Sequence, residues 1–556
     1  MDPEGGAQRP GPVREAEEGS GAPTGSAPGV GPRVDRDASS LRFIYPFTFE
    51  GDTIARRSEA IGSATWRIGE NPIAVWQPWS FPTDDLLSEV AGFVDPEPGS
   101  LVSAGRWRVD ETALRSPSGF GGGARHPGAD WTLTTRRGPI PFLIESIELA
   151  LFRHGVGFVI VSALPVSAEL SDWFTFLHFF RYVHGRRASE VSAVRTTGRD
   201  GDGESTRTAF FPHLGGPQSD DGQQPEKHVF GEVMDHLLST AVLADERPHW
   251  WEEIFVPGMM LPHVGLYVDQ CPADDTPIHL HRLRNFFHAD QAVHPSAAEL
   301  TLDDPGLLPY AANQWFFYSL NGGGFLACDA PRTPFFRATL PEHLTGAYLL
   351  LFVLALDQRF ALMLLSQQVS REWVGGGDES ETDKVAAFRR IRDALLAFTA
   401  QGYFAQTMQE EHHHRSYARW QAVFQLEQLY RNVADEVREM YGDLELRQRD
   451  RAEAVAREQQ RHAENLDRRL TVVTWLLGIP VSLLLVINAA GNIALVRRLL
   501  FGPAGVQAYD VLIGFVLEVV GIVVGYIAYR IFDSRLRREH EEQTRAGELA
   551  MRAPEA

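Results

Sequence analysis

A row of polar and small residues interrupts one of the two most apolar stretches of the chain, between Leu470 and Val496. In a helix, at 100° per residue, six members of this row fall within an arc of roughly 120°. They are Thr471, Thr474, Gly478, Ser482, Asn488 and Asn492, and Gly491 stands beside the last of them. Polar groups in hydrocarbon are costly unless they are satisfied. The row should therefore face water, as the lining of a pore made by several copies of the helix, or face another helix.

Two other sets of residues have the spacing of metal ligands. His279 and His281 alternate as residues on one face of a strand do, and such a pair could bind zinc. Glu410 and His414 are four residues apart on an expected helix, which is the spacing of a metal-binding pair. Ordinary solvated or core side chains would produce the same patterns.

The polar row must be positioned by the apolar stretches themselves, residues 470–496 and 511–531. A helix needs roughly 20 apolar residues to cross a bilayer core. Both stretches are long enough, and the short loop 497–510 between them predicts a transmembrane hairpin. Because arginines are concentrated outside the hairpin, both chain ends should be cytoplasmic, at a plasma membrane of bacterial type. Glu518, inside the second span, is an intramembrane carboxylate that could function directly or bond a neighbouring helix.

Composition limits the remaining possibilities. The chain has 556 residues and a formal charge of -21, which argues against a nucleic-acid partner and suits divalent cations. Two scattered cysteines, Cys271 and Cys328, predict neither a disulfide framework nor a zinc motif and fit a reducing cytoplasm. We find no P-loop and no nucleophile arrangement with a recognisable spacing, so we do not expect an enzyme.

The part before the hairpin is expected to be soluble and in two parts. Residues 146–163 are expected to form a hairpin, and Leu261–Asp269 and Gln314–Leu320 are expected to be strands. Short strands that pair mostly with their neighbours in the chain predict an α+β cytoplasmic domain with a largely antiparallel sheet. Helical patterns follow, and one of them predicts a helix over Tyr403–Tyr441. The very apolar run from Tyr348 to Gln367 is interrupted by Asp357, which favours a core helix. The expected segments are a disordered arm 1–40, the α+β domain 41–335, a helical region 336–441, a stalk helix 442–469, the first span 470–496, the external loop 497–510, the second span 511–531 and a cytoplasmic tail 532–556.

The stalk helix is highly charged and contains neither Gly nor Pro after Gly442. Gly442 and Asp443 are expected to break the helix before it. A charged helix of this length is unstable alone. It needs sister helices, and this predicts an oligomer.

This order of segments resembles the CorA superfamily of magnesium and divalent-cation channels. Leu470-Thr471-Val472-Val473-Thr474, followed by Pro480, looks like the opening of that family's pore helix. The resemblance implies a homopentamer in the lipid bilayer, with a pore lined by the first span and a divalent cation, Mg²⁺ or else Co²⁺ or Zn²⁺, as the transported ion. It also implies that Asn492 stands for the signature asparagine that holds the hydrated ion at the pore mouth.

The chain departs from the family at this mouth. The family's Gly-Met pair before the asparagine is absent, and the external loop carries Arg497 and Arg498 with no acidic residue before Asp510. Two alternatives therefore stand beside a channel gated by its cytoplasmic domain. One is a membrane-anchored sensor or scaffold of the same architecture that conducts nothing. The other is a membrane-tethered metalloenzyme that uses the histidines near 279–294.

Overall fold

The computed structural model describes residues 31–49, 51–68, 71–96, 103–115, 131–183, 192–196, 207–209, 227–228, 230, 258–291, 295–301, 304, 306–374 and 381–501, together with the single residues 516, 519, 520, 523, 526, 527, 530 and 534. The chain divides into two compact units, Met1–Tyr441 and Gly442–Ala556. The long helix α11 (Leu426–Phe501) contributes to both units.

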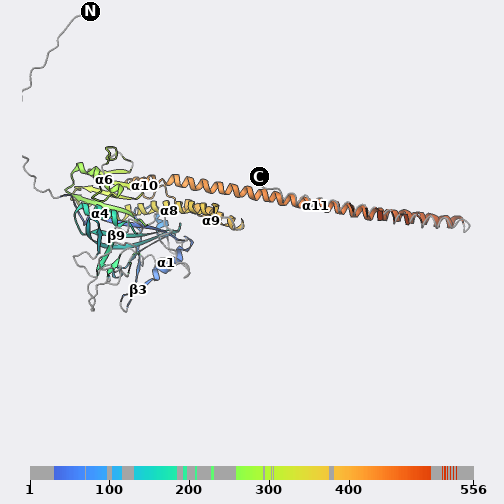
Figure 1. The fold of residues 1–556 in the computed structure, drawn as a ribbon, viewed down its shortest axis with the longest axis horizontal. Helices are drawn as coiled ribbons and strands as arrows, with labels where there is room; N and C mark the ends of the chain where they lie inside the picture. Colours follow the sequence, from blue (N-terminus) through green and yellow to red (C-terminus); the bar gives the residue numbers. More distant parts are fainter. Residues whose placement is uncertain are drawn as a thin grey trace, which may run out of the picture. The chain divides into compact units, whose positions relative to one another are not determined.

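The first unit is built on a mixed but mostly antiparallel sheet of 14 strands (Figure 1). Its main path runs β12-β11-β10-β7-β8-β9-β2-β13-β16-β15-β14, with β1 on β13, β6 on β8 and β5 on β6. The strands are β1 (Arg33–Val34), β2 (Ser40–Thr48), β5 (Trp76–Pro78), β6 (Ala104–Val109), β7 (Trp131–Thr135), β8 (Gly138–Phe152), β9 (Val156–Pro165), β10 (Ser192–Thr196), β11 (Arg207–Ala209), β12 (Lys227–His228), β13 (Leu261–Asp269), β14 (Leu307–Ala311), β15 (Gln314–Ser319) and β16 (Gly322–Cys328). A separate ribbon joins β3 (Thr65–Ile68) to β4 (Asn71–Ala74).

The helices of the first unit cover both faces of this sheet. They are α1 (Ile54–Ser63), α2 (Ser88–Val94), α3 (Glu111–Arg115), α4 (Leu170–Phe180), α6 (Thr276–Asn285), α7 (Leu340–Thr345), α8 (Ala347–Val374), α9 (Glu381–Gln401) and α10 (Glu411–Val423), with short turns η1 (Gly51–Thr53), η3 (Ala273–Asp275) and η4 (Phe335–Thr339). One face packs on α4 and α6, as in the contact of Phe43 with Phe180 at 4.8 Å between ring centroids. The other packs on α8 and α10, where Phe316 meets Tyr348 at 4.6 Å. Apolar side chains that alternate along the strands therefore fill two layers of core.

Several expected elements are present in the structure. The hairpin of β8 and β9 turns at Gly155, whose positive φ of 85° suits a glycine. The run from Tyr348 to Gln367 lies within α8, inside the segment Phe335–Glu372. Among the residues whose side chains are described, that segment is the one candidate long and apolar enough to cross a membrane, and 78% of its most apolar window is buried in the fold. It is a core helix.

Four sequence expectations were wrong. The arm 1–40 was expected to be disordered, but β1 and the first residue of β2 lie within it, and residues 1–30 lie outside the described part. Residues 276–285 form helix α6 and not a strand. The helix expected over 403–441 is divided, because Gln425 adopts a left-handed φ of 53° between α10 and α11.

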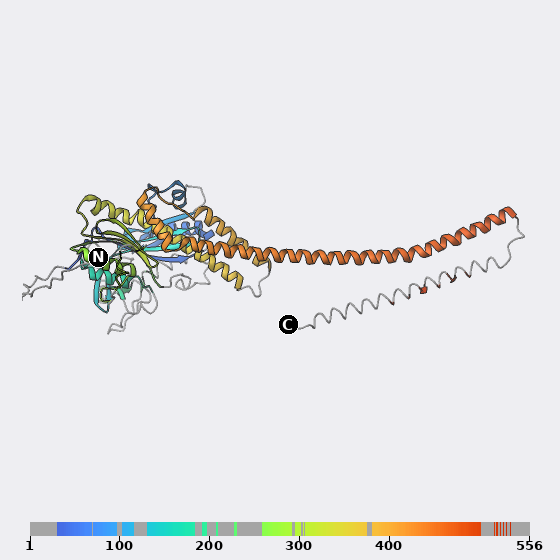
Figure 2. The ribbon, with the colours of Figure 1, turned by 90° about the horizontal axis from the view of Figure 1, so that it is seen from above.

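The fourth error concerns Gly442, which does not end a helix. Helix α11 passes through it, and the ion pair of Asp443 with Arg447 at 2.7 Å supports the same turn. One glycine inside a helix costs about 1 kcal/mol relative to alanine. The hydrogen bonds of a long continuous helix outweigh that cost, so the helix continues (Figure 2).

Candidate functional site

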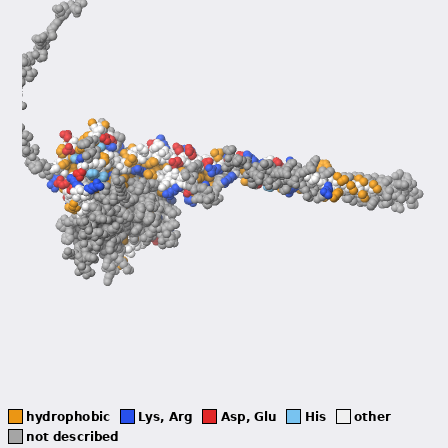
Figure 3. All heavy atoms as spheres, in the orientation of Figure 1, with side chains coloured by type: hydrophobic (Ala, Val, Ile, Leu, Met, Phe, Trp, Pro, Cys, Tyr) orange, Lys and Arg blue, Asp and Glu red, His pale blue; other side chains and the backbone are white. Residues whose placement is uncertain are grey.

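The apolar end of α11 has no cover within the described residues. Seven large apolar side chains between positions 470 and 483 are 42–66% exposed: Leu470, Val473, Trp475, Leu476, Leu477, Ile479 and Leu483. Figure 3 shows hydrophobic side chains clustered on this described part of the helix. Exposed apolar surface of this extent marks a site that contacts a membrane or a protein partner.

The expected pore-lining residues all lie on this one helix. Thr471, Thr474 and Gly478 are exposed on it, and the hydroxyl of Thr474 donates to the carbonyl of Leu470 at 2.8 Å. A threonine satisfied within its own helix is tolerated in hydrocarbon. A side chain added at Gly478 would meet no atom within 4 Å. The backbone of α11 also includes Ser482, Asn488, Gly491 and Asn492, whose side chains are outside the described part, as is the whole of Glu518.

The charged part of α11 is stabilised along its own length. Glu445 pairs with Arg449 at 2.7 Å and Glu453 with Arg457 at 2.9 Å, each an i,i+4 pair with the acid first. Such pairs contribute about 0.2–0.5 kcal/mol each. Pairs of this strength do not stabilise an isolated helix of this length. The side chains from Glu445 to Leu470 are exposed, so packing within the described residues adds nothing to them.

The histidines expected to bind zinc do not form a pair. His279 and His281 lie on helix α6, two residues apart, where side chains point to different sides. His279 packs on Phe174 and His281 on Phe287, with ring centroids 5.8 and 5.7 Å apart. Burial lowers the pKa of His279 to about 4. These are core histidines. On a strand the two side chains would share one face, but on helix α6 they point to different sides.

The second expected metal pair lies at the start of α10. Glu410 is the residue before α10, and its carbonyl accepts the backbone N–H of His414 at 2.9 Å, so the two are related through the main chain. Across the part of the chain that the structure describes, no group of three or more His, Cys, Asp or Glu side chains is placed to hold a metal ion.

A buried ionic cluster was missed by the sequence reasoning. Glu148 on β8 is 1% exposed. Its carboxylate accepts from Arg106 Nε at 3.1 Å and from Arg108 Nη2 at 2.6 Å, both on β6. Burial raises the pKa of Glu148, but the guanidiniums of Arg106, Arg42 and Arg108 outweigh it and hold the pKa below its ordinary value. The signal in the sequence was a single carboxylate inside the apolar strand Ile147–Phe152.

A β-bulge adds a second carboxylate to this cluster. Glu145 and Glu148 are three residues apart and would face opposite sides of a regular strand. The register of β8 on β9 shifts between Ile144 and Ser146, which turns Glu145 toward Arg42 at 3.4 Å and Ser162 at 2.8 Å. The bulge is the reason that Glu145 lies on the same face of the sheet as Glu148.

A second buried pair explains the interruption of the apolar run in α8. Asp357 is 1% exposed and its Oδ2 lies 3.0 Å from Nδ1 of His154 at the turn of the β8–β9 hairpin. His154 stacks on Phe93, with centroids 5.4 Å apart. The amide of Gln358 donates to the carbonyl of Gly402 at 2.8 Å. The polar residues in α8 thus anchor the helix to the hairpin and to the loop after α9.

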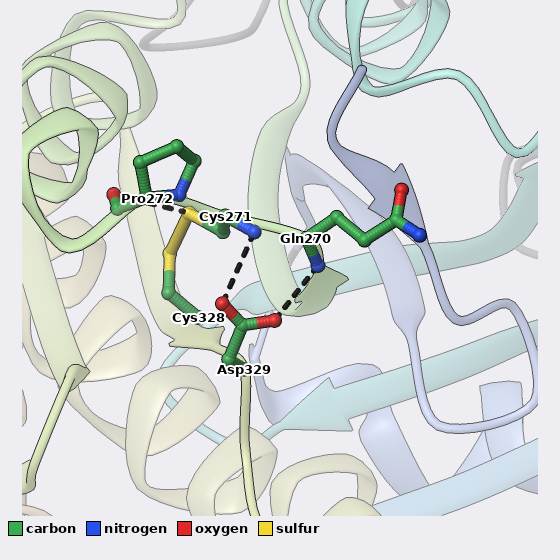
Figure 4. The surroundings of a disulfide bond; sticks show 5 residues. All are labelled: Gln270, Cys271, Pro272, Cys328 and Asp329. Carbon is green, nitrogen blue, oxygen red and sulfur yellow. Dashed lines mark hydrogen bonds between the residues drawn. A yellow bond between two sulfur atoms is a disulfide. The ribbon is translucent and has the colours of Figure 1, made fainter. Parts of the chain in front are cut away.

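The two cysteines are bonded to each other, contrary to the expectation. Cys271 follows β13 and Cys328 ends β16, and the two strands are parallel neighbours. The carboxylate of Asp329 accepts the N–H groups of Gln270 at 2.7 Å and of Cys271 at 3.2 Å (Figure 4). The sequence placed the cysteines 57 residues apart, and only the parallel pairing brings their Cα atoms to 5.4 Å.

Loss of this bond should lower the stability of the first unit. We expect the double variant Cys271→Ser/Cys328→Ser to lose about 2–4 kcal/mol, because the bond restricts a long loop in the unfolded chain. Urea denaturation followed by tryptophan fluorescence measures this, since 11 of the 12 tryptophans precede Gly442. Dithiothreitol should lower the wild type to the level of the variant and leave the variant unchanged. Alkylation of both thiols in unreduced protein would contradict the prediction.

No family model, no curated protein and no solved structure shows a significant match to this chain.

Proposed function

We propose that the chain is one subunit of a homo-oligomeric membrane channel for a divalent cation, Mg²⁺ or a related ion such as Co²⁺ or Zn²⁺, gated by residues 1–441 from the cytoplasm. One observation supports the proposal most strongly. Helix α11, Leu426–Phe501, continues without a break from a charged segment into an apolar segment whose described side chains are exposed. Such a helix needs a bilayer around its apolar part and sister helices beside its charged part.

Both ends of α11 support the proposed oligomer. On the charged segment, Val455 and Leu466 are 53% and 60% exposed although they are apolar, and their spacing places them on one side of the helix. Copies of the helix packed side by side would cover them. In the apolar segment, packing of copies through the polar row would turn Thr474 and Gly478 toward a common axis. The number of copies, five, rests on the resemblance to the CorA superfamily.

The proposed path for the ion uses the polar row of α11. Thr471, Thr474, Gly478, Ser482 and Asn488 would line it, and Asn492, next to Gly491, would hold the hydrated ion at the outer mouth. Rings of oxygen-bearing side chains replace part of the hydration shell of an ion. Glu518 would bond a neighbouring helix or serve the path from the second span.

Flux into liposomes tests the proposal. The purified chain is reconstituted and uptake of Mg²⁺, Co²⁺ and Zn²⁺ is measured, beside the variants Asn492→Ala and Leu476→Ala. We expect flux of at least one ion, loss of most of it in Asn492→Ala, and wild-type flux in Leu476→Ala, because Leu476 lies on the apolar side of the helix.

A second function is favoured by the charge that follows the apolar segment, in the last turns of α11 and the expected loop after it. Arg497 and Arg498 repel cations at the proposed mouth, and no acidic residue precedes Asp510. Absence of flux for all three ions, from protein shown to be a folded oligomer, would support a non-conducting sensor or scaffold.

Alkylation of Cys271 and Cys328 in intact cells tests whether the first unit lies in the cytoplasm, since disulfides are rare in a reducing cytoplasm.

A further inference from the structure

Two parallel neighbours in the sheet send the chain to opposite faces. After β13 the chain enters α6, whose Leu280 and Leu283 join the core shared with α4. After β16 it enters η4, α7 and α8 on the other face, where Leu344 of α7 packs 3.3 Å from the position of a Cβ on Gly265. In open parallel α/β sheets, ligands bind in the crevice that forms outside the carboxyl ends of strands whose connections diverge, and the parallel pair β13–β16 repeats this arrangement locally.

A cavity of about 690 Å³ lies at this place. Its lining includes Asp269, the last residue of β13, Gln270 after it, Asp329 and Ala330 after β16, and the segment Arg33–Asp37, which comprises β1 and the turn that follows it. Pockets for small molecules measure about 300–1,000 Å³. The volume is therefore that of a site for a molecule of metabolite size.

The floor of the cavity is fixed before any ligand arrives. The disulfide joins the ends of β13 and β16, and the carboxylate of Asp329 bonds two backbone N–H groups of the opposite loop (Figure 4). Gln270 and Asp329 both have left-handed φ angles, 59° and 50°, at the same level of the two strands. A pre-formed floor reduces the entropy lost on binding.

The charges of the lining are not balanced pair by pair. Asp35 and Asp269 are both engaged by Arg337, at 2.6 and 2.9 Å, and Asp329 is engaged by the two N–H groups. Among the described residues, neither Arg33 nor Arg36 has a carboxylate partner, and Nε of Arg36 is buried without a hydrogen bond. The acidic side chains also form no group that could hold a metal ion within the described part. Among the described residues, the charges facing the cavity without an ion-pair partner thus include the guanidiniums of Arg33 and Arg36 and the carboxylate of Asp37.

We propose that this cavity binds a small organic anion whose carboxylate or phosphate is held by Arg36 and Arg33. A guanidinium presents N–H donors in a planar fork that matches both anions. Asp37, which also lines the cavity, would accept a hydroxyl or amino group of the same molecule. The site is independent of the apolar helices and of the proposed ion path.

Titration calorimetry on the full chain in detergent micelles tests the site. The probes are inorganic phosphate, AMP, malate and, as the uncharged counterpart, adenosine. We expect at least one anionic probe to bind the wild type and adenosine not to bind. Binding of phosphate or AMP would identify the anion as a phosphate, and binding of malate would identify it as a carboxylate. Arg36→Ala should weaken binding by about tenfold or more, since a hydrogen bond to a charged group is lost. Added salt should weaken it as well.

Matched variants keep the result interpretable. Arg392→Ala removes an exposed arginine of α9 that pairs with Asp393 outside the cavity, and should bind as the wild type does. If Arg36→Ala fails to fold, Arg33→Ala takes its place, because Arg33 is exposed and its removal leaves no buried gap. The proposal is overturned if no anionic probe binds the wild type, or if the folded cavity variants bind as tightly as Arg392→Ala.

Discussion

Replacing Glu148 with alanine should lower the free energy of unfolding of the first unit by about 3–5 kcal/mol, the cost of breaking a buried ion pair by removing one partner. The carboxylate is the common acceptor for Arg106 and Arg108, and the Arg106 side chain is only 8% exposed. Without it, Arg106 would lie buried and uncompensated, and Arg42 would keep only Glu145 as a carboxylate partner. Urea denaturation followed by tryptophan fluorescence gives the value.

Glu145→Ala is the matched control for that change. Glu145 belongs to the same cluster but its side chain is 46% exposed, so its pair with Arg42 is screened by solvent and should contribute about 1 kcal/mol or less. An equal loss in the two variants would show that burial does not decide the energy of this cluster. A small loss in both would mean that water enters and hydrates the arginines.

The first unit should also lose about 4 kcal/mol of stability between pH 7 and pH 5.5, from three buried histidines that stay neutral in the fold. Burial lowers the pKa of His263 to about 3, of His279 to about 4 and of His413 to about 4. Charged neighbours add to the effect of burial or oppose it: Arg42 lowers the pKa of His263 further, Asp275 raises the pKa of His279, and His412 lowers the pKa of His413 further.

The sign of the pH effect follows from proton binding. In the unfolded chain a histidine has a pKa of about 6.5, so between that pH and about 4 the unfolded state binds more protons than the folded state. The contribution of the neutral histidines to the free energy of unfolding is therefore fully present above that pH window and falls as the pH is lowered through it. The stabilisation due to the low pKa of Glu148 is lost only at still lower pH, where carboxylates titrate.

His279→Phe separates this effect from a general acid response. Neither ring nitrogen of His279 has a hydrogen-bond partner among the described residues, and the ring packs on Phe174. Phenylalanine should therefore be tolerated at pH 7 and should reduce the loss at pH 5.5 by about one third, since one of three titrations is removed. His462→Gln, at an exposed position of α11, should leave the loss unchanged. Urea curves at the two pH values measure both.

Local patterns predicted those elements whose conformation is decided by neighbours in the chain. The β8–β9 hairpin, β13, β15 and the core helix α8 were all expected, because alternation along a strand and an uncapped apolar run are local signals. The division of the 403–441 helix at Gln425 and the passage of α11 through Gly442 were not expected. Helix ends depend on cap geometry and on tertiary contacts, which composition describes poorly.

The sequence by itself determined the presence of a very apolar segment after a charged one on a continuous helix, and the positions of the residues from Thr471 to Asn492 along it, because both depend on local spacing alone. Only the tertiary structure decided what surrounds Glu148, Asp357 and Cys271. Their partners lie 40, 203 and 57 residues away. Such contacts are set by strand register, by a bulge in β8 and by the parallel pairing of β13 with β16. These features arise when distant strands meet, and no short-range pattern in the chain records them.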